Sequence, residues 1–457
     1  MSSEILAVWE QAGGRLPDGW ELVRFESLLR DAKGIAVGVM YPGPDTPGGT
    51  PLIKVGDIKD GVISATPSYR ISPETDHEYR RTRLDGDELL ITLVGNPGEC
   101  VVVRPTMAGW NPARAIAVVR LKSTGLRTYL KAVLESAAGK HLIDAVLNTT
   151  VQKTLNLKDI RNLPIPVPPP WIIRGISSFA EALIDRIALL RETNVTLEAV
   201  AQALFKSWFV DFDPVRAKIE GRVPEGMDEA TAALFPGGFE ESELGLVPSG
   251  WRVDAIGKFV EGIYDGPHAT PSEADEGPIF LGIKNLTGSG LDLGEVRHIH
   301  ENDWAQWTRR ITPCHGDIVF SYEATLGFFA LIPPETRCCL GRRLALIRPN
   351  QKSGDGHFWF HQFIAPPFQR LLDKHTIHGA TVNRIALKEF PSLSVLNPPG
   401  ALKATFDNRV APLWRRIHEG QAQAQTLTAL RDALLPRLIS GQLRLPDAKA
   451  QIEQAFA

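Results

Sequence analysis

The sequence predicts an α/β protein of the α+β type: two duplicated mixed α/β domains separated by a long antiparallel two-helix coiled coil, with the halves related by an approximate twofold. Three observations lead to this prediction. Short motifs recur in the same order about 230 positions apart, an offset too long for a solenoid repeat and typical of a duplicated half. Two long runs carry the apolar spacing of a coiled-coil seam. A Pro-Pro pair precedes each of these runs.

The repeated motifs delimit the two domains. They are a Pro-x-Gly-Trp run at 17–20 and 248–251, a Gly-Asp run at 86–90 and 316–320, an Arg-led apolar run at 114–120 and 342–348, and Pro-Pro at 168–169 and 398–399. In this alignment Asp87 corresponds to Asp317. We therefore place the first domain at residues 1–170 and the second at residues 246–398.

Short apolar runs bounded by Gly, Pro and Asn predict the strands of the first domain. We expect strands at 52–58, 89–94, 99–103 and 115–121, the middle two joined as a hairpin across 95–98, and helices at 128–138 and 141–147. The second domain is expected to repeat this plan.

The first long helix is predicted at residues 171–213. From 176 to 208 its apolar residues follow alternating steps of four and three, the spacing of a coiled-coil seam. Asn194 is the polar member of the seam and would fix the register with a partner helix; a solvent-facing Asn on an ordinary packed helix is the alternative. The apolar residues at 204–209 predict that the free chain hides this surface or associates through it.

The second long helix is predicted at residues 399–445, where the same spacing returns from Phe406 onward. Its centre, 420–425, is small and polar. If the two helices run antiparallel, we expect this narrow part to lie opposite Asn194.

The remaining segments are a connector at 214–245 and a C-terminal tail at 446–457. Asp213-Pro214 should stop the first long helix, and the connector is rich in Gly, Pro and acidic residues. It is expected to hold at most a short helix, at 229–234.

Composition leaves the function open. The chain has 457 residues, 43% hydrophobic and 23% charged, with a net charge of −3, which neither suggests nor excludes a nucleic-acid partner. It has no apolar run near 18 residues and no signal-peptide pattern, so the expected compartment is the cytoplasm. The four cysteines lack metal-ligand spacing and are expected to be reduced and structural.

Motifs for catalysis are weak. Asn397-Pro398-Pro399-Gly400 resembles the loop of adenine methyltransferases but lacks the aromatic residue that stacks on the base, so a turn before a helix explains it better. No phosphate-binding loop or nuclease cluster is evident, and the histidine pairs His298/His300 and His375/His378 are expected at the surface rather than on a metal. We predict no catalytic and no metal-binding residues.

Basic clusters occupy comparable places in the two copies, ahead of the Gly-Asp strands. Arg and Lys beside hydroxyl and amide residues suit phosphate contacts and base-edge hydrogen bonds, although a solvated charged face is the alternative. The candidate DNA-binding residues are Lys54, Lys59, Arg70, Arg80, Arg81, Arg83, Lys284, Asn285, Arg297, Arg309 and Arg310.

The chain resembles a type I restriction-modification specificity subunit over nearly its whole length. The resemblance is carried by the duplication, the Pro-rich run at 163–170, and the segment Ala203–Pro214, with further matches at 55–58, 86–90, 151–152 and 434–438. It implies two target recognition domains that each read one half of a split DNA sequence, and a non-catalytic chain.

The resemblance also implies partners. They are double-stranded DNA, two methyltransferase subunits and restriction subunits, with S-adenosylmethionine, ATP and Mg²⁺ on the partner subunits, no cofactor in this chain and no membrane. The helices would set the gap between half-sites and carry the methyltransferase-docking and coiled-coil residues Leu183, Ile187, Asn194, Leu197, Leu204, Phe205, Trp208, Leu413, Ile417, Leu427 and Leu434. The alternatives are a protein interaction scaffold that does not read DNA and a self-contained adenine methyltransferase.

Overall fold

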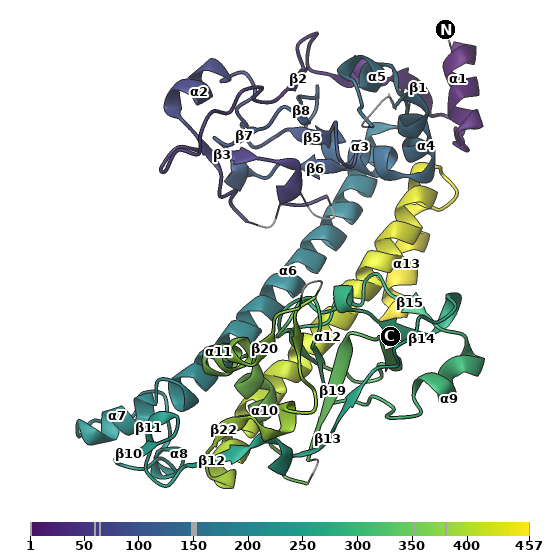
Figure 1. The fold of residues 1–457 in the computed structure, drawn as a ribbon. Coiled ribbons are helices and arrows are strands. Elements are labelled where there is room, and N and C mark those ends of the chain that lie inside the picture. Colours follow the sequence, from purple (N-terminus) through teal and green to yellow (C-terminus); the bar gives the residue numbers. More distant parts are fainter. Residues whose placement is uncertain are drawn as a thin grey trace. The chain divides into compact units, whose positions relative to one another are not determined.

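The computed structural model describes residues 2–58, 61–63, 65–147, 153–350, 352–379 and 382–456. The chain divides into two compact units (Figure 1). Unit 1 comprises Met1–Ala188 and Thr426–Ala457, and unit 2 comprises Leu189–Gln425. The long helices α6 (Pro170–Phe209) and α12 (Gly400–Ile439) contribute residues to both units, so each unit holds one globular domain and one part of each long helix.

Unit 1 is built on two small sheets and a separate strand pair. An antiparallel sheet has the order β2 (Ile35–Val37), β8 (Ile116–Val119), β5 (Leu89–Thr92), β6 (Cys100–Val102). A mixed sheet has the order β4 (Arg70–Ile71), β3 (Thr50–Ile53), β7 (Asn111–Pro112), and β1 (Glu21–Arg24) pairs with β9 (Pro164–Val167). The helices of the domain are α1 (Ser2–Gln11), α2 (Pro73–Glu78), α3 (Leu126–Glu135), α4 (Ala137–Val146) and α5 (Leu157–Asn162).

Unit 2 repeats both sheets and the strand pair in the same order, and among the described residues it adds the strand pair β20 (Thr376–Ile377) and β21 (Arg384–Ile385) and the hairpin described below. Its antiparallel sheet has the order β13 (Val260–Asp265), β19 (Leu344–Pro349), β16 (Ile318–Ser321), β17 (Phe329–Leu331). Its mixed sheet has the order β15 (Arg297–His298), β14 (Ala274–Leu281), β18 (Cys338–Leu340), and β12 (Arg252–Ala255) pairs with β22 (Ser394–Asn397). The helices α10 (Gly356–Ile364) and α11 (Pro366–Lys374) take the places of α3 and α4. The predicted fold class is confirmed.

The central strands explain why the apolar runs were readable in the sequence. Every residue of β5 and β8 is buried, and so is every residue of β16. Strands covered on both faces appear as continuous apolar runs rather than as alternating patterns. The hairpin predicted across 95–98 is present, with Leu89 paired to Val102.

One predicted strand ends early. The run at 52–58 is a strand only to Ile53, and Val55–Asp57 forms a 3₁₀ turn. The turn is closed by Asp57, whose carboxylate accepts a hydrogen bond from the Lys54 backbone N–H at 2.7 Å. A local side-chain acceptor has replaced the ladder partner that a longer strand would need.

The repeated Pro-x-Gly-Trp motif forms the same turn twice. The Trp20 N–H donates to the Pro17 carbonyl at 3.2 Å, and the Trp251 N–H donates to the Pro248 carbonyl at 3.1 Å. Both turns require a positive φ before the tryptophan, +79° at Gly19 and +78° at Gly250, which glycine adopts without a steric cost.

A buried carboxylate paired with an arginine lies beside the central sheet of each unit. Glu88 is fully buried and lies 3.0 Å from the Arg120 guanidinium; Asp317 is fully buried and lies 2.6 Å from Arg348. Each carboxylate also accepts the backbone N–H three residues earlier, at 2.9 Å. The structural counterpart of Asp317 is therefore Glu88, not Asp87 as the sequence alignment of the repeats indicates.

The predicted helix seam is present. On α6 the seam residues Ile176, Ala180, Leu183 and Ile187 are buried in unit 1, and Ala201 and Trp208 are buried in unit 2. Within unit 2 the helices run antiparallel, because Phe205 packs on Phe406 at 5.5 Å between ring centroids while Asn194 lies against Gly420. A Cβ at Gly420 would lie 2.5 Å from the Asn194 side-chain oxygen. The predicted register, with the narrow centre of α12 opposite Asn194, is confirmed.

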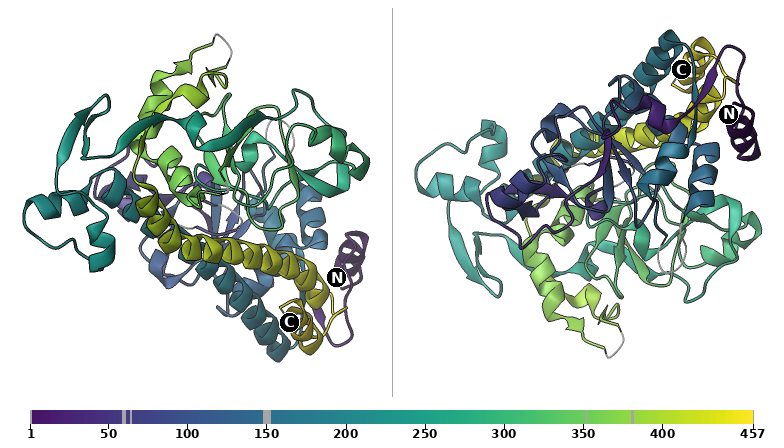
Figure 2. Two further views of the ribbon diagram at one scale, coloured as in Figure 1. Left: turned by 90° about the horizontal axis from the view of Figure 1, so that it is seen from below. Right: turned by 90° about the horizontal axis from the view of Figure 1, so that it is seen from above.

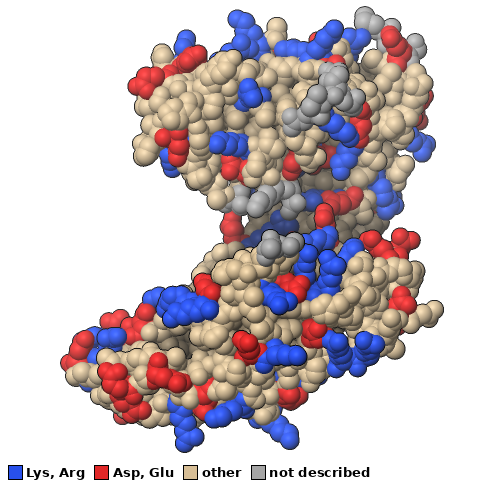
Figure 3. Space-filling model, in the orientation of Figure 1, with Lys and Arg blue, Asp and Glu red and all other residues tan. Residues whose placement is uncertain are grey.

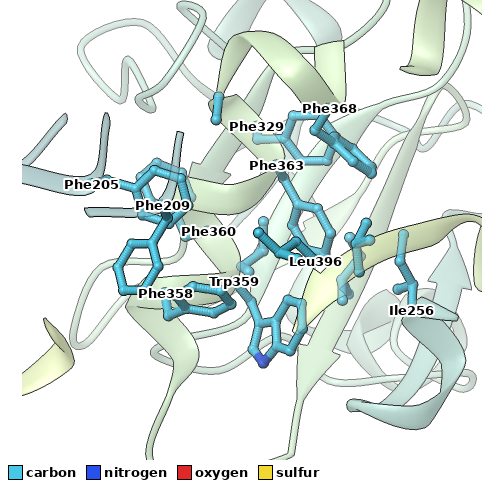
Figure 4. Packing of buried hydrophobic residues seen from close by; sticks show 14 of the residues in the cluster. Phe205, Phe209, Ile256, Phe329, Phe358, Trp359, Phe360, Phe363, Phe368 and Leu396 are labelled. Atoms are coloured by element: carbon cyan, nitrogen blue, oxygen red, sulfur yellow. The ribbon is translucent and has the colours of Figure 1, made fainter. Parts of the chain in front are cut away.

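The apolar residues at 204–209 are hidden within the chain, which was the first of the two predicted alternatives. Phe205, Trp208 and Phe209 are each at most 4% exposed and belong to the large core of unit 2. Phe209 packs edge-on against Phe358 at 5.0 Å, and Figure 4 shows Phe205 and Phe209 beside the aromatic residues of α10. The end of α6 is an integral part of this domain's core.

The connector and tail are more structured than predicted. α6 ends at Phe209, Phe212 adopts a left-handed conformation, and Pro214 then stands in the first turn of a further helix, α7 (Asp213–Ile219), where its missing N–H is tolerated. The short helix α8 (Glu229–Ala233) and a hairpin of β10 (Phe239–Ser242) and β11 (Gly245–Pro248) follow. Figure 2 shows these elements as a small lobe of unit 2. The tail forms α13 (Leu445–Ala455).

Among the residues described, none of the helices combines the length and apolarity that crossing a bilayer would demand.

Candidate nucleic-acid interface

Two neighbouring cavities open beside the mixed sheet of unit 2. The first, of about 300 Å³, is lined by Pro267, His268, Ala269, Gln306, Trp307, Arg309 and Arg310. The second, of about 260 Å³, is lined by Ala269, Thr270, Phe280, Gly282, Ile283, Arg297, Gly341, Arg342 and Arg343. Because both are lined by Ala269, they adjoin, and five arginines converge on one part of the surface. Figure 3 shows Lys and Arg side chains in several groups on one face of unit 2, with acidic side chains between them.

Within the described part of the chain, most of these arginines lack acidic partners. Arg310 forms an ion pair with Asp265. Among the described residues, the other four have no carboxylate oxygen within 4.0 Å of their guanidinium groups. The Arg297 guanidinium lies 4.8 Å from the Phe280 ring centroid, a cation–π contact that orients it. Guanidinium groups that surround a cavity without a carboxylate suit phosphate oxygens and base edges.

Three predicted residues of unit 2 are thus brought together: Arg297, Arg309 and Arg310. Lys284 is exposed, next to the cavity residue Ile283. Asn285 is 2% exposed, so its assignment to DNA binding was wrong. Its side chain accepts the Gly282 N–H at 2.9 Å and donates to the Asp292 carbonyl at 3.0 Å, which closes the same turn that Asp57 closes in unit 1.

Arg342 and Arg343 were missed as site residues. The signal was in the sequence, since Arg342 heads the repeated apolar run and corresponds to Arg114, but an arginine before a buried strand does not by itself indicate a surface site. The Tyr322 hydroxyl donates to the Arg342 carbonyl at 2.9 Å, and burial raises the pKa of Tyr322 to about 12, so it remains a donor. This bond holds the Arg342 backbone and leaves its side chain available.

In unit 1 the predicted residues fall into two groups. Lys54 and Arg70 lie together at the mixed sheet: the Lys54 ammonium is 3.3 Å from the Tyr69 ring centroid, and Arg70 donates to the Gly49 carbonyl at 3.0 Å. By strand register Arg70 corresponds to His298, because Arg70 pairs with Pro51 as His298 pairs with Ile279. Lys59 lies outside the described residues.

The second group follows α2. Arg80 and Arg81 are exposed, and each guanidinium donates only a long bond of 3.4 Å, to the carbonyls of His77 and Lys33. Arg83 is different, because it pairs with Asp76, which is 6% exposed. We assign Arg83 to holding α2 rather than to binding DNA.

The predicted helix residues mostly serve the units themselves. Leu183, Ile187, Phe205, Trp208, Ile417, Leu427 and Leu434 are buried, and Asn194, Leu197, Leu204 and Leu413 are partly buried. The buried residues fill the helix seam and the unit cores, as the coiled-coil part of the prediction requires. The methyltransferase-docking part stays a prediction.

The acidic cluster Asp85, Asp87 and Glu88 brings carboxylate oxygens within 4.8 Å of one another. The Arg120 guanidinium balances the negative charge of this cluster, because it lies 3.8 Å from Asp85 and 3.0 Å from Glu88. The cluster is explained as an arginine-binding site.

Replacing both Arg342 and Arg343 by Ala is expected to weaken binding to all DNA sequences. It should also reduce the magnitude of the slope of log K against log salt by about 0.9 for each phosphate that is no longer neutralised. The assay is fluorescence anisotropy of the assembled complex on duplex DNA at several salt concentrations. The matched control is Arg252→Ala, an exposed arginine of unit 2 on β12. Unchanged affinity and slope in the double variant would exclude this surface.

Comparisons with known proteins agree on one family. No family model matches the chain. The EcoBI specificity subunit of a type I restriction enzyme from Escherichia coli is 28% identical over 198 residues, covering 41% of this chain and 42% of that protein, so the match spans less than half of that relative. The HindI specificity subunit from Haemophilus influenzae is 23% identical over 360 residues, covering 69% of this chain and 74% of that protein.

The fold also has a solved counterpart. The S subunit of a type I restriction-modification system from M. genitalium matches 92% of this chain and 96% of its own, with a TM-score of 0.55 and 14% sequence identity. At that identity the match speaks for the fold alone, and it supports the duplicated architecture described above. The chain is thus similar in sequence to specificity subunits of type I restriction enzymes, and similar in fold to an S subunit of a type I restriction-modification system.

Proposed function

We propose that this chain is the DNA sequence-specificity subunit of a type I restriction-modification complex and that its two domains read the two halves of a bipartite target. The observation that carries the proposal is the duplication. Both units have the same strand order, the same buried carboxylate–arginine pair and the same Pro-x-Gly-Trp turn, while their exposed residues differ. Two domains that read unlike half-sites are expected to share a fold and to differ in their exposed residues.

The basic surface supports the assignment to DNA. In unit 2, Arg297, Arg309, Arg342 and Arg343 converge without acidic partners among the described residues. In unit 1, Lys54 and Arg70 lie together at the corresponding sheet. Phosphate contacts by such residues position a protein on the duplex, and contacts to base edges then supply specificity. A scaffold that binds only proteins would not need this convergence of cations.

The proposal leaves the chemistry to partner subunits. Two methyltransferase subunits would supply S-adenosylmethionine and flip the target adenine, and restriction subunits would use ATP and Mg²⁺. The chain itself would be non-catalytic, since its Asn-Pro-Pro-Gly run has no aromatic residue to stack on a flipped base. It would act in the cytoplasm.

Exchange of residues 1–170 for those of another specificity subunit tests the proposal. We expect one half of the methylated sequence to change and the other half to persist, because each domain would read its own half. Single-molecule sequencing of methylated bases in a host that carries the intact system reports both halves. The reciprocal exchange of residues 246–398 is the matched control and should change the other half.

Two outcomes would favour the alternatives. An unchanged methylated sequence after both exchanges would indicate a protein scaffold that does not read DNA. Methyl transfer by the purified chain alone, with S-adenosylmethionine and DNA, would indicate a self-contained methyltransferase.

A further inference from the structure

We infer that Tyr41, on a short rigid loop of unit 1, contacts base edges in one half-site and determines which sequence that half-site has. This inference rests on the proposed function and deepens it. The loop consists of Met40, Tyr41 and Pro42 and is called the unit 1 ridge. Four observations support it: a fixed crossing of the chain before the ridge, an anchor after it, the exposure of Tyr41, and a matching ridge in unit 2.

The chain crosses the sheet in the same way before both ridges. The Gly38 N–H donates to the Ile116 carbonyl at 3.0 Å, and the Gly266 N–H donates to the Leu344 carbonyl at 3.0 Å. A Cβ added at Gly38 would lie 2.1 Å from the Pro112 carbonyl oxygen. A Cβ added at Gly266 would lie 2.3 Å from the Gly341 carbonyl oxygen. Only glycine permits so close an approach of two backbones, and the crossing sets where each ridge begins.

Further hydrogen bonds extend the match. The Ala113 N–H donates to the Ile53 carbonyl at 2.8 Å, and the Gly341 N–H donates to the Leu281 carbonyl at 2.8 Å. In unit 1 the crossing is pinned once more, because the Val39 N–H donates to the Pro112 carbonyl at 2.8 Å. Val39 is fully buried. Backbone hydrogen bonds therefore fix the position of the residues that precede the unit 1 ridge.

The other end of the unit 1 ridge is held by its neighbours. The Tyr69 hydroxyl donates to the Gly43 carbonyl, directly after Pro42. The Asp45 carboxylate accepts the Arg70 backbone N–H at 2.8 Å. A loop anchored at both ends, with proline at its third residue, loses little conformational entropy when it binds, which favours specific contacts.

Tyr41 projects from this frame. It is 76% exposed and its neighbour Met40 is 37% exposed, whereas the flanking Val39 is buried. A tyrosine on a rigid loop offers a hydroxyl that both donates and accepts, and a ring face that can contact a thymine methyl group. Lys54 and Arg70, beside Tyr69 at the base of the ridge, supply cations for the adjacent phosphates.

The unit 2 ridge, His268 to Thr270, follows Gly266 at the corresponding place. It lies between the two basic cavities, since His268 lines the first, Thr270 lines the second and Ala269 lines both. Its side chains differ from those of the unit 1 ridge, although the crossing before it is the same. The same backbone crossing with different ridge side chains is expected if the two ridges read different bases.

The test uses the complex assembled with its methyltransferase subunits. Tyr41→Ala should lower the preference for the correct base pair at one or two positions of a single half-site by roughly 5- to 100-fold, since a good base contact contributes about 1–3 kcal/mol of discrimination. The readout is the rate of methylation of the cognate duplex against duplexes that each carry one substituted base pair. Tyr41→Phe, which keeps the ring, should retain that preference if the ring makes the contact and lose it if the hydroxyl does.

Val8→Ala is the matched control, because Val8 is an exposed apolar residue of unit 1 outside the ridge, 42% exposed on α1. It should leave all preferences unchanged. The inference is overturned if Tyr41→Ala keeps the wild-type preference at every position, alters both half-sites, or prevents assembly with the methyltransferase subunits. A different result, a wild-type complex that methylates without any sequence preference, would instead overturn the proposed function.

Discussion

Replacing Arg348 by Met will destabilise unit 2 by about 3–5 kcal/mol, because the change leaves a buried carboxylate without its counter-ion. Asp317 is fully buried, and Arg348, 18% exposed at its side chain, binds it through two nitrogens at 2.8 and 2.6 Å. The carboxylate raises the pKa of Arg348, so the arginine stays charged at any pH at which the protein is folded. Urea denaturation combined with hydrogen exchange of the β16 and β19 amides measures the loss in this unit.

A double variant distinguishes the cost of an unpaired buried charge from the cost of changing the packing at this site. Arg348→Met with Asp317→Leu should recover most of the lost stability, because a well-packed apolar pair can replace a buried ion pair at little cost. The same unfolding midpoint for wild type and Arg348→Met would contradict the prediction. In unit 1, Arg120→Met should destabilise the domain by a comparable amount, because it leaves the buried Glu88 carboxylate without its counter-ion. The change also removes the hydrogen bonds from Arg120 to the carbonyls of Arg81 and Arg83, at 2.9 and 2.7 Å.

Replacing Gly38 by Val is expected to cost about 3 kcal/mol and to displace the unit 1 ridge. The added Cβ would lie 2.1 Å from a backbone carbonyl oxygen, and a backbone atom cannot turn away as a side chain can. The β2–β8 pairing next to Gly38 must open instead. Thermal or urea unfolding of the full chain measures the destabilisation, and the methylation assay measures the change at the half-site.

Gly56→Ala is the matched control for Gly38→Val. A Cβ at Gly56 meets nothing within 4 Å, and no positive φ is required there, so stability should stay within about 0.5 kcal/mol of wild type. Equal stabilities for the two variants would show that the crossing is not sterically constrained.

Features that depend on local periodicity were predicted well. The steps of four and three on α6 and α12 identified the seam residues, and the same spacing matched the polar Asn194 with the small Gly420. The strands of the central sheets were found because fully buried strands are continuous apolar runs. The duplicated turn was visible because its glycine is needed for a positive φ.

Features that depend on distant contacts were predicted poorly. Asn285 is polar and stands beside Lys284, which suggested an exposed pair, yet it is buried as the acceptor of its own turn. The aromatic residues near the end of α6 predicted a surface that is hidden or used for association, and only the structure shows that α10 covers them. Glu88 rather than Asp87 is the partner of the buried arginine, because the strand pairing places Glu88 beside Arg120 as it places Asp317 beside Arg348. An alignment of the Gly-Asp motifs does not contain this register.

The order of the residues alone establishes that the chain is a duplication with two paired helices, and in which register those helices meet, because repeats and helical periods can be read along one dimension. The convergence of Arg297, Arg309, Arg342 and Arg343, and the projection of Tyr41 from a pinned loop, become visible only in the folded chain. Those residues come from strands and loops far apart in the sequence, and their proximity depends on backbone crossings such as that of Gly38 over Pro112, which leave no periodic signal.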